Sequence, residues 1–178
     1  MNLEELVSEL SAVAEVRRDE PLSRHTTFGI GGPADVYVKA NTVEELRRAA
    51  AVARRHGAPV FILGSGSNIL VGDGGIRGVV IENNAKGVRG PWEGPDGTVL
   101  LEAESGCNFP SLARRLCREG FTGLEWAVGI PGTLGGAVVY NAGAYGGCLA
   151  DVLVAITVAD EEDRVREIPA EELGLVYR

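Results

Sequence analysis

Long apolar runs are missing from this chain of 178 residues. No stretch approaches the roughly 20 apolar residues that a membrane-spanning helix requires. Residues 1–6 contain acidic side chains and no apolar core segment, so we do not expect a signal peptide there. These absences predict a cytoplasmic protein that does not insert into membranes.

Cysteine and histidine are also scarce. Cys107, Cys117 and Cys148 are odd in number, widely spaced and without a Cys-x-x-Cys pair, which argues against a zinc site or a disulfide framework. We interpret them as buried thiols in a reducing compartment and expect no bound metal. The two histidines, His25 and His56, stand in no recognisable pattern with a nucleophile, so a hydrolytic triad is not expected.

Positive charge is in short supply, because 17 Lys and Arg residues face 25 Asp and Glu residues, a net charge of -8. Nucleic-acid-binding surfaces carry excess positive charge, so we expect no nucleic-acid partner. Apolar residues make up 45% and charged residues 24%, the balance of an ordinary folded protein. The length allows one domain or two small ones, and the sequence leaves the oligomeric state open.

Hydrophobic spacing and helix-capping residues predict a mixture of helices and strands. Thr42 and Glu45 form a capping box, in which the Glu45 carboxylate is expected to reach back to the Thr42 amide. His56 is expected to complement the last carbonyls of the same helix. The predicted helices cover residues 2–15, 42–56 and 108–120 with a short helix from 169; the predicted strands cover 34–38, 60–63, 78–82, 99–103, 153–158 and 165–168; residues 17–24 are read as a polar stretch, 83–97 as an internal boundary and 161–163 as a solvated turn.

A loop of alternating glycine and serine, Gly64 to Asn68, follows the apolar run 60–63, which we interpret as a buried strand. Its backbone amides carry almost no side-chain bulk, so a phosphate could rest against the main chain. The loop is not a dinucleotide fingerprint, because Ile69 replaces the third glycine, and no Gly-Lys-Ser/Thr follows. Residues 69–71 read as further strand. A tight serine-glycine turn between two strands explains the pattern equally well.

A second glycine cluster spans residues 129–147. The small residues after Pro131 suit a helix whose backbone something approaches closely, as a flat aromatic ligand would. Glycine-mediated packing of a helix on a sheet is the alternative. Two such clusters in one chain of this size favour a large ligand.

Four motifs in a fixed order carry a resemblance to a known family. They are Thr26-Thr27-Phe28-x-x-Gly31-Gly32-Pro33-Ala34-Asp35, Gly64-Ser65-Gly66-Ser67-Asn68, Gly129-Ile130-Pro131-Gly132-x-x-Gly135-Gly136 and Asn141-Ala142-Gly143-Ala144-Tyr145-Gly146. From about residue 20 onward the chain resembles the UDP-N-acetylenolpyruvoylglucosamine reductases, which make UDP-N-acetylmuramate for peptidoglycan. The resemblance implies an α+β (mixed α/β) FAD-binding fold of the vanillyl-alcohol-oxidase/PCMH type, with two α/β subdomains at 1–82 and 83–178.

The resemblance also implies the chemistry and the site. FAD would be the cofactor, NADPH the reductant and UDP-N-acetylglucosamine enolpyruvate the substrate. Thr26 and Thr27 are weaker candidates for the cofactor site, because capping a turn explains them as well. The expected residues are Ser65, Gly66, Ser67 and Asn68 at the diphosphate; Ile130, Pro131, Gly132, Gly135, Gly136, Ala137, Asn141, Ala142 and Gly143 along the flavin and ribityl chain; Tyr145 and Tyr177 at the substrate; and Arg178 as the catalytic cation beside the developing enolate.

The family's proton-donating Ser and its late catalytic Glu have no matching motif in this chain. We therefore expect that the chain is truncated before the substrate-binding domain and is inactive alone. A catalytically incompetent FAD- or nucleotide-binding module is the alternative, and an FAD oxidase of the same superfamily is a weaker one. His25 is expected in a loop, where it touches a ligand phosphate or water.

Overall fold

The computed structural model describes residues 2–176, without the side chain of Asp96. Its contacts divide the chain into two compact units. Unit 1 comprises Met1–Ala85 with Ala159–Val165, and unit 2 comprises Lys86–Val158 with Arg166–Arg178. The predicted subdomains, 1–82 and 83–178, stay a prediction. No helix within residues 2–176 has the length and apolar character needed to cross a membrane.

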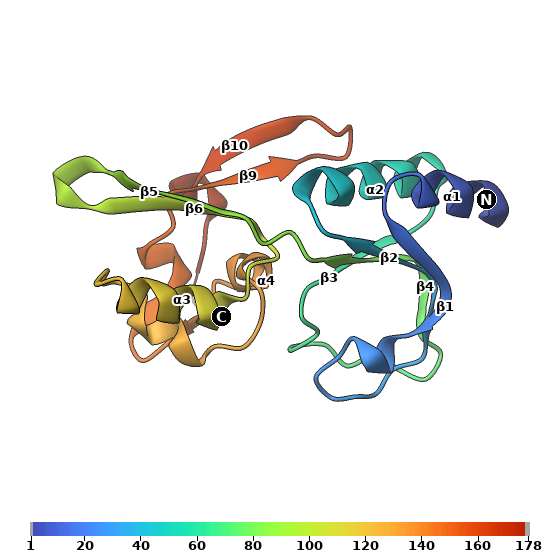
Figure 1. The fold of residues 1–178 in the computed structure, drawn as a ribbon, viewed down its shortest axis with the longest axis horizontal. Coiled ribbons are helices and arrows are strands. Elements are labelled where there is room, and N and C mark those ends of the chain that lie inside the picture. Colours follow the sequence, from blue (N-terminus) through green and yellow to red (C-terminus); the bar gives the residue numbers. More distant parts are fainter. Residues whose placement is uncertain (1, 177–178) are drawn as a thin grey trace. The chain divides into compact units, whose positions relative to one another are not determined.

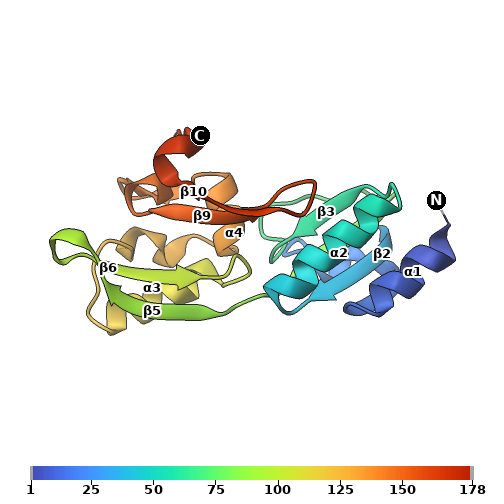
Figure 2. The same ribbon diagram turned by 90° about the horizontal axis from the view of Figure 1, so that it is seen from above.

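Unit 1 is a four-stranded sheet in the order β1-β2-β4-β3, with two helices on one face (Figures 1 and 2). Strand β1 is antiparallel to β2, whereas β2 and β3 both run parallel to β4. The loop that leaves β3 therefore emerges at the carboxyl edge of the parallel strands, a usual place for ligands in such sheets. The elements are α1 (Leu3–Ser11), β1 (Glu15–Pro21), η1 (Leu22–Arg24), β2 (Pro33–Ala40), α2 (Val43–Arg55), β3 (Val60–Leu63) and β4 (Ile76–Asn83).

Alternation along the central strands divides the core of unit 1 between the two faces of the sheet. Val36 and Val38 of β2 belong to the cluster that also holds Leu6 and Leu10 of α1 and several alanines of α2. Tyr37 lies in a different buried cluster, with Leu22, Leu63, Val71 and Val80 among its members. The second cluster includes Leu22, which follows β1, and Val71, which follows β3, so it anchors both of these loops to the sheet.

Helix α2 begins and ends where its capping residues predict. The Thr42 hydroxyl accepts the Glu45 amide at 3.1 Å, and Gly57 after the helix has a left-handed φ of 67°. The Glu45 carboxylate accepts the amide of Asn41 at 2.7 Å instead of the Thr42 amide. The expected capping box therefore reaches one residue further back than predicted.

Several predictions for unit 1 were wrong. The stretch 17–24 is not merely a polar connection, because its first five residues lie in β1, a polar strand at the edge of the sheet, and its last three form η1. The first helix ends at Ser11 instead of residue 15, because the chain turns into β1. Strand β3 is also an edge strand, and Phe61 and Ile62 are 37% and 48% exposed, so it is not buried as expected. Residues 69–71 follow β3 without strand structure.

Unit 2 contains three two-stranded sheets and short helices around a small core. Phe109, Ala113, Ala127, Ala137 and Leu149 form the buried centre. The predicted helix from Asn108 is confirmed, because the Asn108 side chain accepts the Ser111 amide at 3.0 Å. The elements are β5 (Val88–Glu93), η2 (Pro95–Gly97), β6 (Val99–Ala103), α3 (Phe109–Arg118), η3 (Glu125–Gly129), α4 (Leu134–Val139), β7 (Gly143–Ala144), β8 (Gly147–Cys148), η4 (Leu149–Asp151), β9 (Ala155–Ala159), β10 (Val165–Pro169) and η5 (Ala170–Leu173).

Strand β5 lies in the stretch predicted as a boundary, residues 83–97, and was missed because its sequence holds Gly90 and Pro91. The acidic turn 161–163 was also misjudged. Asp163 accepts a hydrogen bond from Arg47 of α2 at 2.6 Å, and both residues belong to unit 1. The turn is therefore held against α2 by an ion pair and is not simply solvated.

Candidate functional site

The loop after β3 borders a hollow of about 280 Å³ in unit 1. Ser65 and Asn68 are exposed, Ser67 is half-buried and Gly66 is buried. The loop thus presents hydroxyl and amide groups to solvent while its glycine faces the protein. The residues that line the hollow are Arg24, His25, Thr26, Thr27, Gly64, Ser65 and Glu82.

Gly66 packs directly against the segment that follows η1. The Thr27 amide donates to the Gly66 carbonyl at 3.0 Å, and the Thr27 hydroxyl donates to the same oxygen at 3.3 Å. Gly66 has a left-handed φ of 63°, and a Cβ there would overlap the carbonyl oxygen of His25. Glycine is therefore required at this position by the protein's own packing, whatever ligand the loop holds.

The Thr26 hydroxyl has a local partner as well. It donates to the Ile30 carbonyl at 2.8 Å, which closes the turn that follows. Capping a turn was one of the two roles expected for Thr26 and Thr27; the structure shows it for the Thr26 hydroxyl, whereas the Thr27 hydroxyl bonds to the distant Gly66 carbonyl. Both residues still line the hollow beside Ser65.

In unit 2, backbone hydrogen bonds join the start of α4 to the loop before α3. Leu134 donates to Cys107 and Gly135 donates to Ser105, both at 2.8 Å. The Thr133 hydroxyl accepts the Gly136 amide at 3.4 Å and caps α4. The predicted helix after Pro131 is confirmed, and its first turn is fixed on one side by these bonds.

The two adjacent glycines of α4 face different surroundings. A Cβ on Gly135 would lie 2.9 Å from the Cβ of Ser105, so close packing explains this glycine. A Cβ on Gly136 would find only the Thr133 hydroxyl within 4 Å, at 3.5 Å, among described residues beyond its own helix and chain neighbours. Gly136 is exposed, and no packing contact of the described chain requires it.

The remaining predicted positions of unit 2 differ in exposure. Ala137 is 6% exposed and belongs to the core, with Ile130 and Ala142 packed against it. Asn141, at φ 41°, is 5% exposed and its side-chain oxygen accepts the Ala150 amide at 2.9 Å. Buried side chains of this kind shape the segment, so any ligand contact here must use backbone or neighbouring atoms.

The β7–β8 turn holds the last predicted positions that the structure describes. A Cβ on Gly143 would lie 2.8 Å from the Gly147 carbonyl oxygen, so packing explains this glycine too. Tyr145 is 92% exposed at the tip of the turn, with a left-handed φ of 51°. Tyr177 and Arg178 lie outside the described residues.

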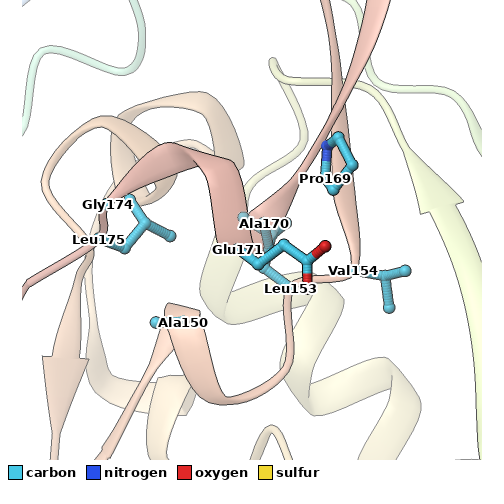
Figure 3. Close-up of a pocket in the computed structure, with 8 residues that line it drawn as sticks. All are labelled: Ala150, Leu153, Val154, Pro169, Ala170, Glu171, Gly174 and Leu175. Carbon is cyan, nitrogen blue, oxygen red and sulfur yellow. The ribbon is translucent and has the colours of Figure 1, made fainter.

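A larger hollow of about 590 Å³ lies in unit 2 near the end of the described chain. Figure 3 shows the side chain of Glu171 between Val154 and Pro169 on one side and Gly174 and Leu175 on the other. None of the residues predicted for the cofactor lines this hollow. It is bordered by Ala150, Leu153, Val154, Pro169, Ala170, Glu171, Gly174 and Leu175.

The predicted diphosphate loop lies in unit 1, and the predicted flavin and substrate positions lie in unit 2. Hydrogen bonds hold the backbone of Gly66 in unit 1 and that of Leu134 and Gly135 in unit 2. Within residues 2–176, no group of three or more His, Cys, Asp or Glu side chains could hold a metal ion.

Residues 34–168 match the family model described as an FAD binding domain. The chain belongs to this FAD binding domain family. Because the match covers most of the chain and spans both units, the mixed helix and strand architecture is that of the family. The fold predicted from the four motifs is thereby confirmed.

Similar proteins give a more specific resemblance. The chain is 48% identical over 160 residues to UDP-N-acetylenolpyruvoylglucosamine reductase of Rubrobacter xylanophilus, covering 90% of this chain and 52% of that protein. It is 42% identical over 185 residues to the reductase of Moorella thermoacetica, covering 100% of this chain and 58% of that protein. The chain thus spans about half the length of the curated relatives it matches, and the predicted resemblance to these reductases is confirmed.

Solved structures of related proteins show the same fold as this chain. The crystal structure of UDP-N-acetylenolpyruvylglucosamine reductase from Thermus caldophilus aligns with a TM-score of 0.68 and 35% identity, over 93% of this chain and 55% of that chain. A solvent-stable cholesterol oxidase aligns with the same TM-score of 0.68 at 16% identity, over 89% of this chain and 34% of that chain. The second likeness shows the shared FAD-binding fold alone.

An ion cluster in this family member was missed at the sequence level. The His25 ring lies between the carboxylates of Glu20 and Glu82, two partners that the sequence did not predict. The alternation of β2 and β4 could have placed Tyr37 and Glu82 on one face, since Val80 shares the buried cluster of Tyr37. The sequence offered no comparable signal for Glu20 on β1.

The second histidine was also assigned the wrong partner. His56 Nε2 lies 3.0 Å from Glu9 Oε1 on α1, so its ring joins two helices instead of complementing helix carbonyls. The hydrogen bond from His56, followed by that from Arg55, lowers the pKa of Glu9. This pair lies on the helix-covered side of unit 1, where residues of α1 and α2 form the first core cluster.

Proposed function

We propose that the chain is the FAD-binding part of a UDP-N-acetylenolpyruvoylglucosamine reductase, which consumes NADPH and makes UDP-N-acetylmuramate for peptidoglycan. The observation that carries the proposal is the identity of 38–48% with eight such reductases, each aligned over at least 90% of this chain. Membership of the FAD binding domain family supports the cofactor.

Ser65, Gly66, Ser67 and Asn68 would hold the diphosphate of FAD through backbone amides and hydroxyls. The exposure of Ser65 and Asn68 beside the hollow supports this assignment. In unit 2, the backbone of residues 130–143 would border the flavin and its ribityl chain. When bound, FAD would accept hydride from NADPH and deliver it to the enolpyruvyl double bond.

The substrate side is assigned to three residues. Tyr145 and Tyr177 would contact UDP-N-acetylglucosamine enolpyruvate. Arg178 would stabilise the negative charge that develops beside the substrate carboxylate after hydride addition, because a fixed cation lowers the energy of that state. The full exposure of Tyr145 leaves its ring available for such a contact.

A titration with FAD tests the proposal. We expect the purified chain to bind FAD, with a change in flavin fluorescence and a shifted visible absorption spectrum. With NADPH and the enolpyruvyl substrate, we expect little or no turnover by the 178-residue chain alone. A folded chain that leaves both flavin signals unchanged would contradict the cofactor assignment. Binding without turnover, even when the chain is extended to the length of its relatives, would favour the FAD-binding module instead.

The neighbouring glycines of α4 give a matched pair of variants. In Gly136→Ala the added methyl group enters open space, so we expect the free energy of unfolding to stay unchanged or rise by up to about 1 kcal/mol. If the flavin packs on this surface, the same methyl group should weaken FAD binding by roughly tenfold or more. Fluorescence titration and urea unfolding of the variant measure the two effects.

Gly135→Ala is the control for that experiment. Its methyl group meets Ser105, so we expect a loss of about 1–3 kcal/mol in unfolding free energy. A Gly136→Ala variant that binds FAD as tightly as the wild type would remove Gly136 from the cofactor surface. A Gly136→Ala variant destabilised as much as Gly135→Ala would contradict the packing described for α4.

A further inference from the structure

The ring of His25, which lines the hollow in unit 1 together with Glu82, lies between the carboxylates of Glu82 and Glu20. Nδ1 lies 2.7 Å from Glu82 Oε2, and Nε2 lies 3.0 Å from Glu20 Oε1. The side chains of His25, Glu20 and Glu82 are 13%, 7% and 23% exposed, so water screens the contact with Glu20 poorly and the contact with Glu82 more. The ring centroids of His25 and Tyr37 lie 4.4 Å apart with the rings tilted by 35°, and Tyr37 belongs to the second buried cluster.

Both ring nitrogens need a proton in this arrangement. A neutral imidazole has a single N–H, so it can donate to one carboxylate only, and its other nitrogen would turn a lone pair toward the second. With both carboxylates ionised, the imidazolium alone satisfies both contacts.

The neighbouring groups fix the charges around the ring. The hydrogen bond from His25, assisted by the positive charge of Arg17 and opposed by burial, lowers the pKa of Glu20 and keeps it ionised. Arg17 of β1 donates to Glu20 at 3.2 Å, and Arg24 of η1 lies 3.8 Å from the same oxygen. Burial, with the hydrogen bond to Glu82, raises the pKa of Tyr37. Its neutral hydroxyl therefore donates to Glu82 Oε2 at 2.7 Å.

The backbone of the same residue touches the predicted diphosphate loop. The His25 carbonyl occupies the space where a Cβ of Gly66 would lie, and two residues later the Thr27 amide donates to the Gly66 carbonyl. Loss of the ring proton would turn one His25 contact from attractive to repulsive. Because the segment is short, movement of the ring would be passed to the Gly66 loop.

We propose that His25, as an imidazolium bridging Glu20 and Glu82, is a positioning residue that fixes the Ser65–Asn68 loop for the FAD diphosphate and makes FAD affinity pH-dependent. The inference rests on the proposed function, because it assigns FAD to this loop. The inference adds His25 to the residues that shape the diphosphate site, and it adds a dependence of FAD affinity on pH that the glycine-serine motif does not predict. The ligand chemistry at stake is the dianionic diphosphate, which a misplaced loop would meet with fewer amides.

The test compares FAD dissociation constants at about pH 6 and about pH 9, on either side of the range in which imidazoles usually titrate. For the wild-type chain we expect binding to weaken by roughly tenfold or more at the higher pH. For His25→Gln we expect binding that is weaker than wild type at the lower pH by roughly ten- to a hundredfold, and that changes little with pH. His56→Gln removes the other histidine and should keep the wild-type profile.

Hydrogen exchange at the Thr27 amide, corrected for the intrinsic effect of pH on exchange rates, measures how firmly the Gly66 loop is held when no FAD is present. We expect protection to fall at the higher pH in the wild type and to be low at both pH values in His25→Gln. Parallel FAD profiles for wild type and His25→Gln, or equal Thr27 protection in both, would overturn the proposal even if the variant melts at a lower temperature. A wild-type chain that binds no FAD contradicts the proposed function. In that case hydrogen exchange at the Thr27 amide alone tests whether His25 fixes the Ser65–Asn68 loop. Should His25→Gln fail to fold, a pH-independent wild-type profile would still overturn the inference.

Discussion

Gly66→Ala is expected to lower the free energy of unfolding by roughly 2–5 kcal/mol and to abolish tight FAD binding. Two costs add: a left-handed backbone costs a residue with a Cβ about 1–2 kcal/mol, and overpacking costs about 1–3 kcal/mol. The φ of Gly66 is 63°, and the new methyl group would overlap the carbonyl oxygen of His25. The segment carrying Thr27 must then move away from the loop that we assign to the diphosphate.

Gly29→Ala separates the two costs. Gly29 has nearly the same φ, 67°, but no heavy atom of residues 2–176 lies within 4 Å of its ideal Cβ, chain neighbours aside. We expect this variant to lose only about 1–2 kcal/mol, the backbone term. Urea unfolding of both variants, with FAD titration of whatever remains folded, gives the comparison. Equal losses in the two variants would show that contact with His25 does not constrain the loop.

The sequence places Gly66 at the diphosphate for a different reason, because a loop with little side-chain bulk lets a phosphate rest against the main chain. The structure shows that Gly66 is buried against the protein, whereas Gly136 is open. A sequence marks both positions with the same letter. Whether a glycine admits a ligand or a neighbouring backbone depends on what lies opposite, and this is set by contacts between distant segments.

Elements with strong local signals were predictable. Helix α2 follows from Thr42, the apolar stripe and Gly57, and strand β6 from a run of β-forming residues. The polar strands β1 and β5 carry no clear alternation, because each pairs along one side only and leaves most side chains exposed. Their hydrogen bonds come from a partner strand, which local pattern does not reveal.

The ion cluster of His25, Glu20 and Glu82 could not be predicted from the sequence for the same reason. His25 and Glu82 are 57 positions apart in the chain and meet only because β4 lies inside the sheet. The glycine-serine loop, by contrast, could be located from sequence, since a strand followed by a bulk-free turn is a local pattern. Local patterns therefore located the candidate site, while the side chains that hold it in place required the fold.

Phe109→Ala tests whether the buried centre of unit 2 supports the second half of the candidate site. Phe109 is 1% exposed and packs edge-on against Trp126, with ring centroids 5.8 Å apart. Removing a buried Phe side chain costs about 3–5 kcal/mol, through lost transfer energy and the cavity left behind. Phe28→Ala makes the same change at a side chain that is 64% exposed, and we expect it to cost less than about 1 kcal/mol.

Tryptophan fluorescence is a suitable readout, because Trp92 and Trp126 both belong to unit 2. The Phe109 amide donates to the Gly132 carbonyl at 3.0 Å, so the cavity opens beside the segment that the bonds to Ser105 and Cys107 hold in place. We therefore expect Phe109→Ala to reduce hydrogen-exchange protection at Gly135 and to weaken FAD binding beyond what Phe28→Ala causes. If Phe109→Ala unfolds at the same urea concentration as the wild type, the aromatic core does not stabilise this unit. If it is destabilised yet binds FAD normally, the glycine-rich segment of unit 2 does not contribute to cofactor binding.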